Sequence, residues 1–372
     1  TESWNGTSWT EVNDLGTAGN ELGGTGTTST ALALGREPPS NFALTEEWAF
    51  SGIPPTTTAV GYSDSIVGDM YYNSTTGQYK AIQDGGAPIG TWASGPNLNA
   101  ACREGGGSGT STSAINVGGY PYPMTAEQWN GSTWTTFTNM GTPRGKNASA
   151  GTYTNAITSA GATPSTPGYG TVNNNESWNG SAWSEIADLN QIREAYAMTA
   201  GGTNTAALVI GGMYSPGKLN VVEQWNGSSW TEVNEINTAR ALMAGAGTVT
   251  AGLISGGQST ADSADTETWN GTSWTEVNNL NTARKGVGGT SVSSTDGLIF
   301  GGQTTTLSAN TESWNGTSWT EVSDLGTARY QLKGGGPSST GALGFGGYTT
   351  TDVANTEEWT AGDFSIKTVT TS

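Results

Sequence analysis

The chain has 372 residues, 57 of them glycine, and its 13 Lys and Arg against 31 Asp and Glu give a formal net charge of −18. Such an acidic chain repels phosphate backbones, so we expect no nucleic-acid partner. No uninterrupted apolar run approaches the roughly 18–20 residues that a membrane helix needs, so we expect no membrane partner. The sequence has no histidine and one cysteine, Cys102. This composition excludes Ser-His-Asp catalysis, His-ligated metals and an internal disulfide, and it predicts no metal and no cofactor.

The first residues, "ESWNGTSWTEV" at 2–12, return almost unchanged at 267–277 and 312–322. Each copy holds an Asn-Gly-Thr acceptor pattern for N-glycosylation, but Asn-Gly is also typical of a two-residue type I′ hairpin turn. Because the pair recurs between the same two expected strands, we interpret it as a turn and the acceptor pattern as a by-product. The chain starts at Thr1 inside this motif, so we expect it to be part of a longer polypeptide. The six copies of the turn begin at Asn5, Asn130, Asn179, Asn226, Asn270 and Asn315.

The pattern Glu-x-Trp recurs about every 45 residues, apart from one longer step between Trp48 and Trp129. A period of roughly 40–50 residues is typical of a four-stranded β-propeller blade. One full unit, 267–302, contains the expected strands "TETW", "SWTEV", "KGVGGTSV" and "DGLIFGG", and no helical period is found. The sequence therefore predicts one all-β propeller over 1–372. The pattern occurs at Glu2/Trp4, Glu46/Trp48, Glu127/Trp129, Glu176/Trp178, Glu223/Trp225, Glu267/Trp269, Glu312/Trp314 and Glu357/Trp359.

All 15 tryptophans fall on this repeat, and each buried indole removes about 150–250 Å² from water. We therefore expect them to pack between blades rather than to bind a ligand. Trp48 is expected to pair with Trp92 across an insertion at 49–91, which leaves Trp359 without a partner. The structural set is Trp4, Trp9, Trp48, Trp92, Trp129, Trp134, Trp178, Trp183, Trp225, Trp230, Trp269, Trp274, Trp314, Trp319 and Trp359.

An arginine recurs in the linker that follows the second tryptophan, and Gly19 and Cys102 replace it in two units. We expect these arginines to pair with the glutamates of Glu-x-Trp inside or between blades. The alternative is a ring of charge around the propeller axis that binds a ligand. The arginines are Arg144, Arg193, Arg240, Arg284 and Arg329.

The Gly pairs that follow the apolar strands, with a Trp on a later strand and then an Arg, resemble the kelch repeat. "TEEW", "WNGTSWTEVNDL" and "NTAR" more closely resemble kelch-like repeat proteins of tailed phages from aquatic bacteria. "GDMYYNSTTGQYKAI" at 68–82 resembles a short module of phage fibre and other virion proteins, and "FSIKTVTTS" resembles the C-terminus of that group. The resemblance covers nearly the whole chain and implies a virion structural protein. Gly35-Arg36 and "TSAGATP" at 158–164 depart from the pattern, so those two turns are expected to be irregular.

Seven apolar strands of the "ALxFGG" type predict seven blades, whereas Glu-x-Trp occurs eight times. We favour a closure in which residues 1–15 supply the outer strands of the blade begun at 330–347, so that the N- and C-terminal parts share one blade. The alternative is that 356–371 completes that blade. A closed ring hides sheet edges.

Strand alternation places the loops after the Gly pairs and the "LNTAR" linkers on one face, and these loops vary between repeats. Recognition usually lies in variable loops on a rigid scaffold. Exposed tyrosines suit stacking on sugar rings, although they could equally pack their own loops. The candidate ligand-binding residues are Tyr120, Tyr122, Tyr169, Tyr214 and Tyr348.

The insertion at 49–91 is expected to contain a hairpin with "NSTTG" at its tip. It could dock a neighbouring subunit or another virion protein, or it could have no binding role. The candidate docking residues are Tyr71, Tyr72 and Tyr79.

Together these patterns predict a virion structural protein, such as a tail or head fibre or appendage, that uses a rigid propeller to display loops. Its expected partners are other virion proteins and host-surface glycans, its expected location is the surface of the virion, and it could form a homo-oligomer. The alternative is a lectin-like adhesive surface protein of a bacterium. We expect no enzymatic activity, because a glycosidase needs paired carboxylates in a pocket and the acids here recur in every blade or lie singly in loops.

Overall fold

The computed structural model describes residues 90–121, 125–164, 169–199, 203–290 and 292–362, together with the backbone of several short strands outside these ranges. The chain divides into two compact units, Thr1–Ile66 and Val67–Ser372. In the first unit, β1 (Glu2–Trp4) pairs with β2 (Trp9–Glu11). A three-stranded sheet follows, formed by β3 (Gly23–Gly26), β4 (Thr30–Leu34) and β5 (Thr45–Ala49).

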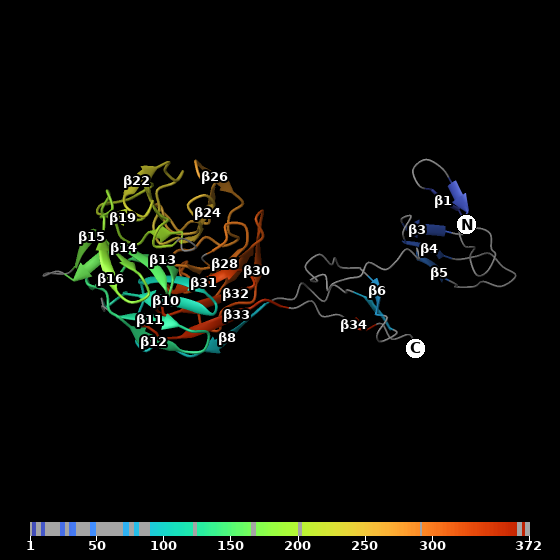
Figure 1. Ribbon diagram of the computed structural model, residues 1–372, viewed down its shortest axis with the longest axis horizontal. Helices are drawn as coiled ribbons and strands as arrows, with labels where there is room; N and C mark the ends of the chain where they lie inside the picture. The colour runs from blue at the N-terminus through green and yellow to red at the C-terminus, as the bar shows by residue number, and fades with distance from the viewer. Residues whose placement is uncertain are drawn as a thin grey trace. The chain divides into compact units, whose positions relative to one another are not determined.

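The second unit contains six four-stranded antiparallel sheets in its described part, and we number them blade 1 to blade 6. Figure 1 shows them arranged as a disc, which is the β-propeller architecture. From inner to outer strand, blade 1 is β9 (Gly106–Thr110), β10 (Ser113–Val117), β11 (Ala126–Trp129) and β12 (Trp134–Phe137). Blade 2 is β13 (Ala148–Thr152), β14 (Asn155–Pro164), β15 (Tyr169–Trp178) and β16 (Trp183–Ile186).

Blade 3 is β17 (Ala197–Met198), β18 (Ala207–Ile210), β21 (Val222–Trp225) and β22 (Trp230–Val233), with a small hairpin of β19 (Met213–Tyr214) and β20 (Gly217–Lys218). Blade 4 is β23 (Ala244–Gly247), β24 (Gly252–Ser255), β25 (Thr266–Trp269) and β26 (Trp274–Val277). Blade 5 is β27 (Gly288–Gly289), β28 (Gly297–Phe300), β29 (Thr311–Trp314) and β30 (Trp319–Val322). Blade 6 is β31 (Lys333–Ser338), β32 (Gly341–Phe345), β33 (Thr356–Thr360) and β8 (Thr91–Gly95).

The ring is closed by a strand exchange, but not by the predicted segment. The outer strand of blade 6 is β8, which precedes blade 1 in sequence and pairs antiparallel with β33. Trp359 therefore faces Trp92, with ring centroids 5.5 Å apart, and the predicted pairing of Trp92 with Trp48 is wrong. The described strands also form six four-stranded sheets, whereas the sequence predicts seven blades. Both errors have one cause, because the repeat at 1–49 forms β1 to β5 in the first unit.

Backbone hydrogen bonds run from blade to blade in two closed circuits. In the first, six residues just before the inner strands each donate an N–H to the carbonyl of the equivalent residue in the preceding blade. We call these residues the mouth ring; five of the bonds measure 2.8–3.2 Å and the sixth joins the Lys146 N–H to the Glu104 carbonyl. The members are Glu104, Lys146, Ala195, Leu242, Gly286 and Gln331. Such a circuit can form only if the six inner strands close on themselves.

The second circuit uses the glycine that ends the apolar strand of each blade. Its N–H donates to the carbonyl of the linker residue that begins the next blade, at 2.7–3.1 Å. In blade 3 this is Gly212, with φ near +100°, and a Cβ there would lie 2.7 Å from the Tyr196 Cβ. The last bond, from Gly347 to the Cys102 carbonyl, joins blade 6 to blade 1. Blade 2 has Ala160-Gly161 in place of a Gly pair, and a β-bulge there matches the irregularity expected at 158–164.

The tryptophans of each blade pack against the blade before it. In blade 3, Trp225 and Trp230 lie in one apolar cluster with Ala150 and Ile157 of blade 2. Except for Trp274, the outer-strand indoles of the six blades also donate to the preceding blade; Trp230 Nε1, for example, lies 3.1 Å from the Ala187 carbonyl. Burial of these rings between neighbouring sheets is the main hydrophobic contribution to the disc.

Each of the five linker arginines is fully buried and pairs with the Glu-x-Trp glutamate of its own blade, at 2.6–2.9 Å. In blade 3, Arg193 Nη2 contacts Glu223 Oε1 at 2.7 Å, while Nη1 donates to the carbonyls of Gly211 and Val221. Burial lowers the pKa of Arg193, and the Glu223 carboxylate partly offsets this effect. The pairs therefore hold the linker, the apolar strand and the Trp-bearing strand of one blade together.

The Asn-Gly turns are built differently from the predicted two-residue type. Trp129 faces Trp134 across four residues, so Asn130 is the first corner of the turn and Gly131, with φ near +90°, follows it. The Asn130 side-chain oxygen accepts the N–H groups of Ser132 and Thr133, both at 2.9 Å. The same geometry recurs at Asn179, Asn226, Asn270 and Asn315. Asn5 lies outside the described residues.

The insertion contains the predicted hairpin, formed by β6 (Met70–Asn73) and β7 (Gln78–Ala81). A third strand, β34 (Lys367–Thr368), pairs with β7. The side chains of Tyr71, Tyr72 and Tyr79 lie outside the described residues, so their docking role stays a prediction.

Replacing Arg193 by Met is expected to lower the free energy of unfolding by about 3–5 kcal/mol, because it leaves the Glu223 carboxylate buried without its cation. The measurement is equilibrium denaturant unfolding. The matched control is Lys285→Met, whose pair with Asp262 is partly exposed and should contribute about 1 kcal/mol or less. Equal losses for both variants would contradict the role assigned to the buried pair.

A chain that begins at Val67 keeps β8 and all six blades, so it is expected to melt at the same temperature as the propeller of the full chain. A chain that begins at Pro96 lacks β8 and Trp92 and exposes the edge of β33. Its melting temperature should fall by about 10 °C, as expected for the loss of one large aromatic contact. Thermal unfolding followed by circular dichroism distinguishes this closure from one that uses residues 1–15.

Candidate binding face at the channel mouth

The loops after the apolar strands and the linkers before the inner strands meet on one side of the disc, which we call the loop face. Isolated bridges join the two sets in every blade, as between Arg103 and Tyr120 and between Tyr330 and Tyr348. The mouth ring lies on this face, where the central channel opens. The predicted placement of the variable loops is therefore observed.

The mouth ring has one backbone conformation and six different side chains. Its members have φ between +53° and +61°, a left-handed region that residues other than glycine rarely adopt. Because every blade repeats this conformation, it serves closure of the ring. The side chains, in contrast, differ from blade to blade. Three neighbours are polar and three are small or apolar, namely Gln331, Glu104 and Lys146 against Ala195, Leu242 and Gly286.

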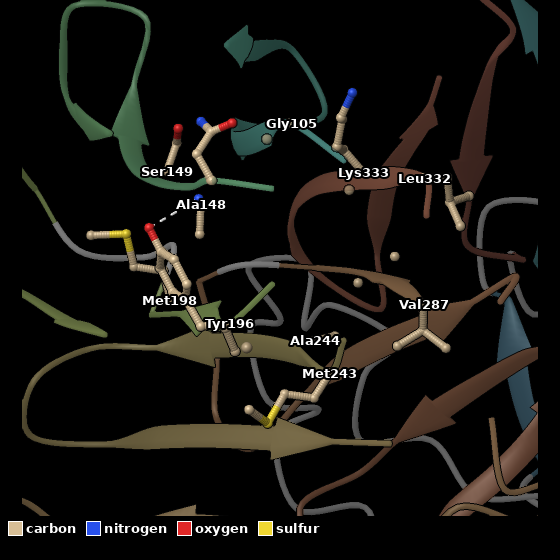
Figure 2. Close-up of a pocket in the computed structure, with 17 residues that line it drawn as sticks. Gly105, Ala148, Ser149, Tyr196, Met198, Met243, Ala244, Val287, Leu332 and Lys333 are labelled. Carbon is tan, nitrogen blue, oxygen red and sulfur yellow. Dashed lines mark hydrogen bonds between the residues drawn. The ribbon is translucent and has the colours of Figure 1, made fainter. Parts of the chain in front are cut away.

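These side chains line a cup of about 110 Å³ at the channel mouth. A second cavity of about 120 Å³ lies along the inner strands of all six blades. Figure 2 shows the second cavity, with Met198, Met243 and Val287 on its wall and the Tyr196 hydroxyl accepting the Ala148 N–H. Each is smaller than the roughly 300–1,000 Å³ typical of small-molecule pockets, so the cup suits a substituent of a larger ligand.

The polar half of the cup is a network of hydrogen bonds and charges. Gln331 donates its side-chain amide to Glu104, and Lys146 pairs with Glu194 at 2.9 Å. Burial raises the pKa of Glu104 above its ordinary 4.5, although the nearby Lys146 and Arg103 partly oppose this effect. Burial also raises the pKa of Tyr330 to about 12, so its phenol is neutral at physiological pH.

Beside the cup, the Arg103 guanidinium lies between two aromatic rings. Its central carbon is 4.3 Å from the centre of the Tyr120 ring and 4.7 Å from that of Tyr348. Asp352 accepts from its Nη1 at 2.6 Å. This stack presents one exposed tyrosine face, because Tyr120 is 36% exposed. Cation–π contacts of this kind fix the rings in place.

The structure brings together two of the five predicted tyrosines, Tyr120 and Tyr348. Tyr214 is exposed on the β19–β20 hairpin. Tyr122 and the side chain of Tyr169 lie outside the described residues. A ligand-binding role for these five residues stays a prediction.

Several residues of the face were missed in the sequence: Arg103, Glu104, Lys146, Gln331 and Asp352. They lie where the repeat varies, and Arg103 and Glu104 directly follow the Cys102 that interrupts the arginine pattern. Variation after each linker arginine is the signal that could have identified the mouth ring.

Comparisons with known proteins support the fold and no more specific identity. No family model matches the chain, and no curated protein matches it. The solved structure of YjhT is similar, with a TM-score of 0.63 and 13% sequence identity over 74% of this chain and 99% of that one. The chain is an all-β propeller. At this identity the likeness concerns the fold alone.

The described residues contain no helix that is both long and apolar enough to cross a membrane. They also contain no group of three or more His, Cys, Asp or Glu residues arranged to hold a metal ion.

Replacing Glu104 by Gln is expected to stabilise the chain increasingly as the pH rises. A raised pKa means that folding favours the protonated acid, so this contribution is complete below the unfolded-state pKa and is lost as the pH rises through the folded-state pKa. The variant should match the parent at pH of about 4 and exceed it at about 8, measured as the free energy of unfolding.

The control is Glu194→Gln, which removes the pair with Lys146 and should destabilise the chain at neutral pH. A pH-independent difference between the parent and Glu104→Gln would overturn the role assigned to the Glu104 charge.

Proposed function

We propose that the chain is a non-enzymatic binding module of a virion, with kelch-like repeats, that forms part of a tail or head fibre or appendage of a phage. The observation that carries the proposal is that the backbone of the loop face is constant from blade to blade while its side chains vary. Backbone circuits fix the ring, while the side chains on it differ in every blade. Variation confined to one face of a rigid scaffold is typical of recognition.

The partner that this face suits is a polar, hydroxyl-rich polymer such as a host-surface glycan, or a protein that presents similar groups. Tyr120 offers an aromatic face held by Arg103, and Glu104, Lys146 and Gln331 offer donors and acceptors in a cup of limited volume. A sugar ring stacks on an aromatic face while its hydroxyls bond to such groups.

The carboxylates of the loop face suit a binding role better than a role in glycoside hydrolysis. On the described part of the loop face, Glu194, Asp262 and Asp352 each pair with a Lys or Arg. Glycoside hydrolysis requires an acid and a second carboxylate that flank the scissile bond. Carboxylates neutralised by cations suit hydrogen bonding to a ligand.

The second candidate is a lectin-like adhesive protein of a bacterial surface, which the same tyrosine and charged cup would serve. Immunogold labelling of intact particles separates the two, since a virion protein must label the particle. Label on cells and none on particles would favour the adhesive protein.

Replacing Tyr120 by Ala is expected to weaken binding to glycans or host cells by about 30-fold, corresponding to about 2 kcal/mol for an aromatic at the centre of an interface. Glycan arrays followed by titration on the best ligand provide the measurement. Tyr153→Ala is the matched control, because Tyr153 is 42% exposed but lies in the turn just after β13, at the end of that strand away from the mouth ring. Equal loss in both variants, or no loss in either, would contradict the proposed face.

A further inference from the structure

Blade 1 departs from the other blades at the linker position of the buried arginine. Cys102 occupies it. Among the residues that the structure describes, Glu127 of this blade forms no ion pair with an arginine. The Asn99 backbone and side-chain N–H groups donate to Glu127 at 2.8 Å and 2.7 Å, as the equivalent asparagines of blades 3 to 5 donate to their glutamates. Cys102 is 2% exposed and lies at the seam where blade 6 meets blade 1.

Blade 6 departs from the others on the opposite side of the same seam. Lys333 occupies the first position of its inner strand, where the equivalent residues are small. Its side chain is buried, and the Nζ atom lies 3.1 Å from the Cys102 Sγ. In Figure 2 the ammonium end turns away from the other labelled side chains of the cavity. The equivalent residues are Gly106, Ala148, Ala197, Ala244 and Gly288.

The partner of this lysine is unusual among the buried cations. The five linker arginines each contact a carboxylate, whereas within the described ranges no carboxylate forms an ion pair with Lys333, and its Nζ meets the thiol. Asn116 is the other neighbour of the sulfur, with Nδ2 3.5 Å from it. A buried ammonium without a carboxylate is unfavourable, so a reaction that removes its charge is favoured.

We propose that Cys102 and Lys333 are joined in air by a covalent N–O–S bridge, with dioxygen as the oxidant. The Lys333 ammonium first releases one proton to solvent. The thiol, the resulting neutral amine and one O₂ then give R–S–O–NH–R′ and one water. The S–H bond and one N–H bond break, and S–O and N–O bonds form to a single oxygen atom. Sulfur and nitrogen each lose two electrons, and the two oxygen atoms take up the four. Two equivalents of a dithiol reverse the reaction, releasing thiol, amine and water.

Such a bridge would change how the ring is closed. Cys102 and Lys333 are 231 positions apart. The bridge would join blade 1 to the inner strand of blade 6, the blade whose outer strand is β8 paired with β33. A covalent link across so long a loop restricts the unfolded chain and stabilises the closed disc. Oxidation would therefore fix the propeller in its closed form.

The test is intact mass spectrometry of the full chain purified in air. The oxidised chain should exceed the anaerobic, dithiol-treated chain by the mass of one oxygen atom less two hydrogen atoms. Tandem spectra should link the peptides that contain Cys102 and Lys333. Dithiol treatment should restore the lower mass and shift denaturant unfolding to lower concentration.

Three variants make the test decisive. Cys102→Ser and Lys333→Arg should show neither the mass gain nor the reductant-dependent shift, whereas Lys285→Arg, at a partly exposed lysine, should keep both. One free thiol per unfolded chain after aerobic purification would overturn the proposal. A gain of whole oxygen atoms that persists in Lys333→Arg would also overturn it, since that result indicates oxidation of the cysteine alone.

Discussion

The inter-blade hydrogen bonds of the mouth ring are the constraint on which the rest of the propeller depends. Each bond needs one residue with positive φ, and five of the six residues have a side chain that disfavours this conformation. The strain of each is about 1–2 kcal/mol, and it is tolerated because the bond satisfies groups that would otherwise be buried without partners. The arginine–glutamate pairs of blades 2 to 6 and the indoles between the blades then hold neighbouring blades at the angle that lets the next bond form.

Closure distinguishes the seam between blades 6 and 1 from the five other interfaces. There, the blade is completed by β8, which lies before the ring in sequence, and hydrogen bonds join residues more than 200 positions apart. The loss of entropy on closing so long a loop is offset by contacts at this one interface. It is at this interface that the arginine is replaced by Cys102 and a small residue by Lys333. The seam keeps the backbone geometry of the others while its side-chain chemistry changes.

The sequence predicts the blade well and the ring less well, for a physical reason. Strand order, the burial of the tryptophans and the pairing of Arg with Glu follow from local periodicity, which every repeat carries. The number of blades depends on which strands find partners, and local sequence does not determine this. The segment "TEEW" at 45–48 is identical to that at 356–359, yet β5 ends a three-stranded sheet and β33 accepts β8. Two strands with the same residues thus have different partners, and their own sequence does not predict which partner each one has.

The residues of the candidate binding face could not be predicted from periodicity either. Periodicity identifies residues that repeat, whereas Arg103, Glu104 and Gln331 are found where the repeat is interrupted. Sequence patterns indicated loops with tyrosines, but the rings of Tyr120 and Tyr348 become neighbours only because the closed ring brings blade 1 beside blade 6. The stack around Arg103 thus belongs to the seam, since it takes one ring from each of these blades. The proposed recognition surface and the closure of the disc therefore share one interface, so a change that loosens the seam should disturb the binding face as well.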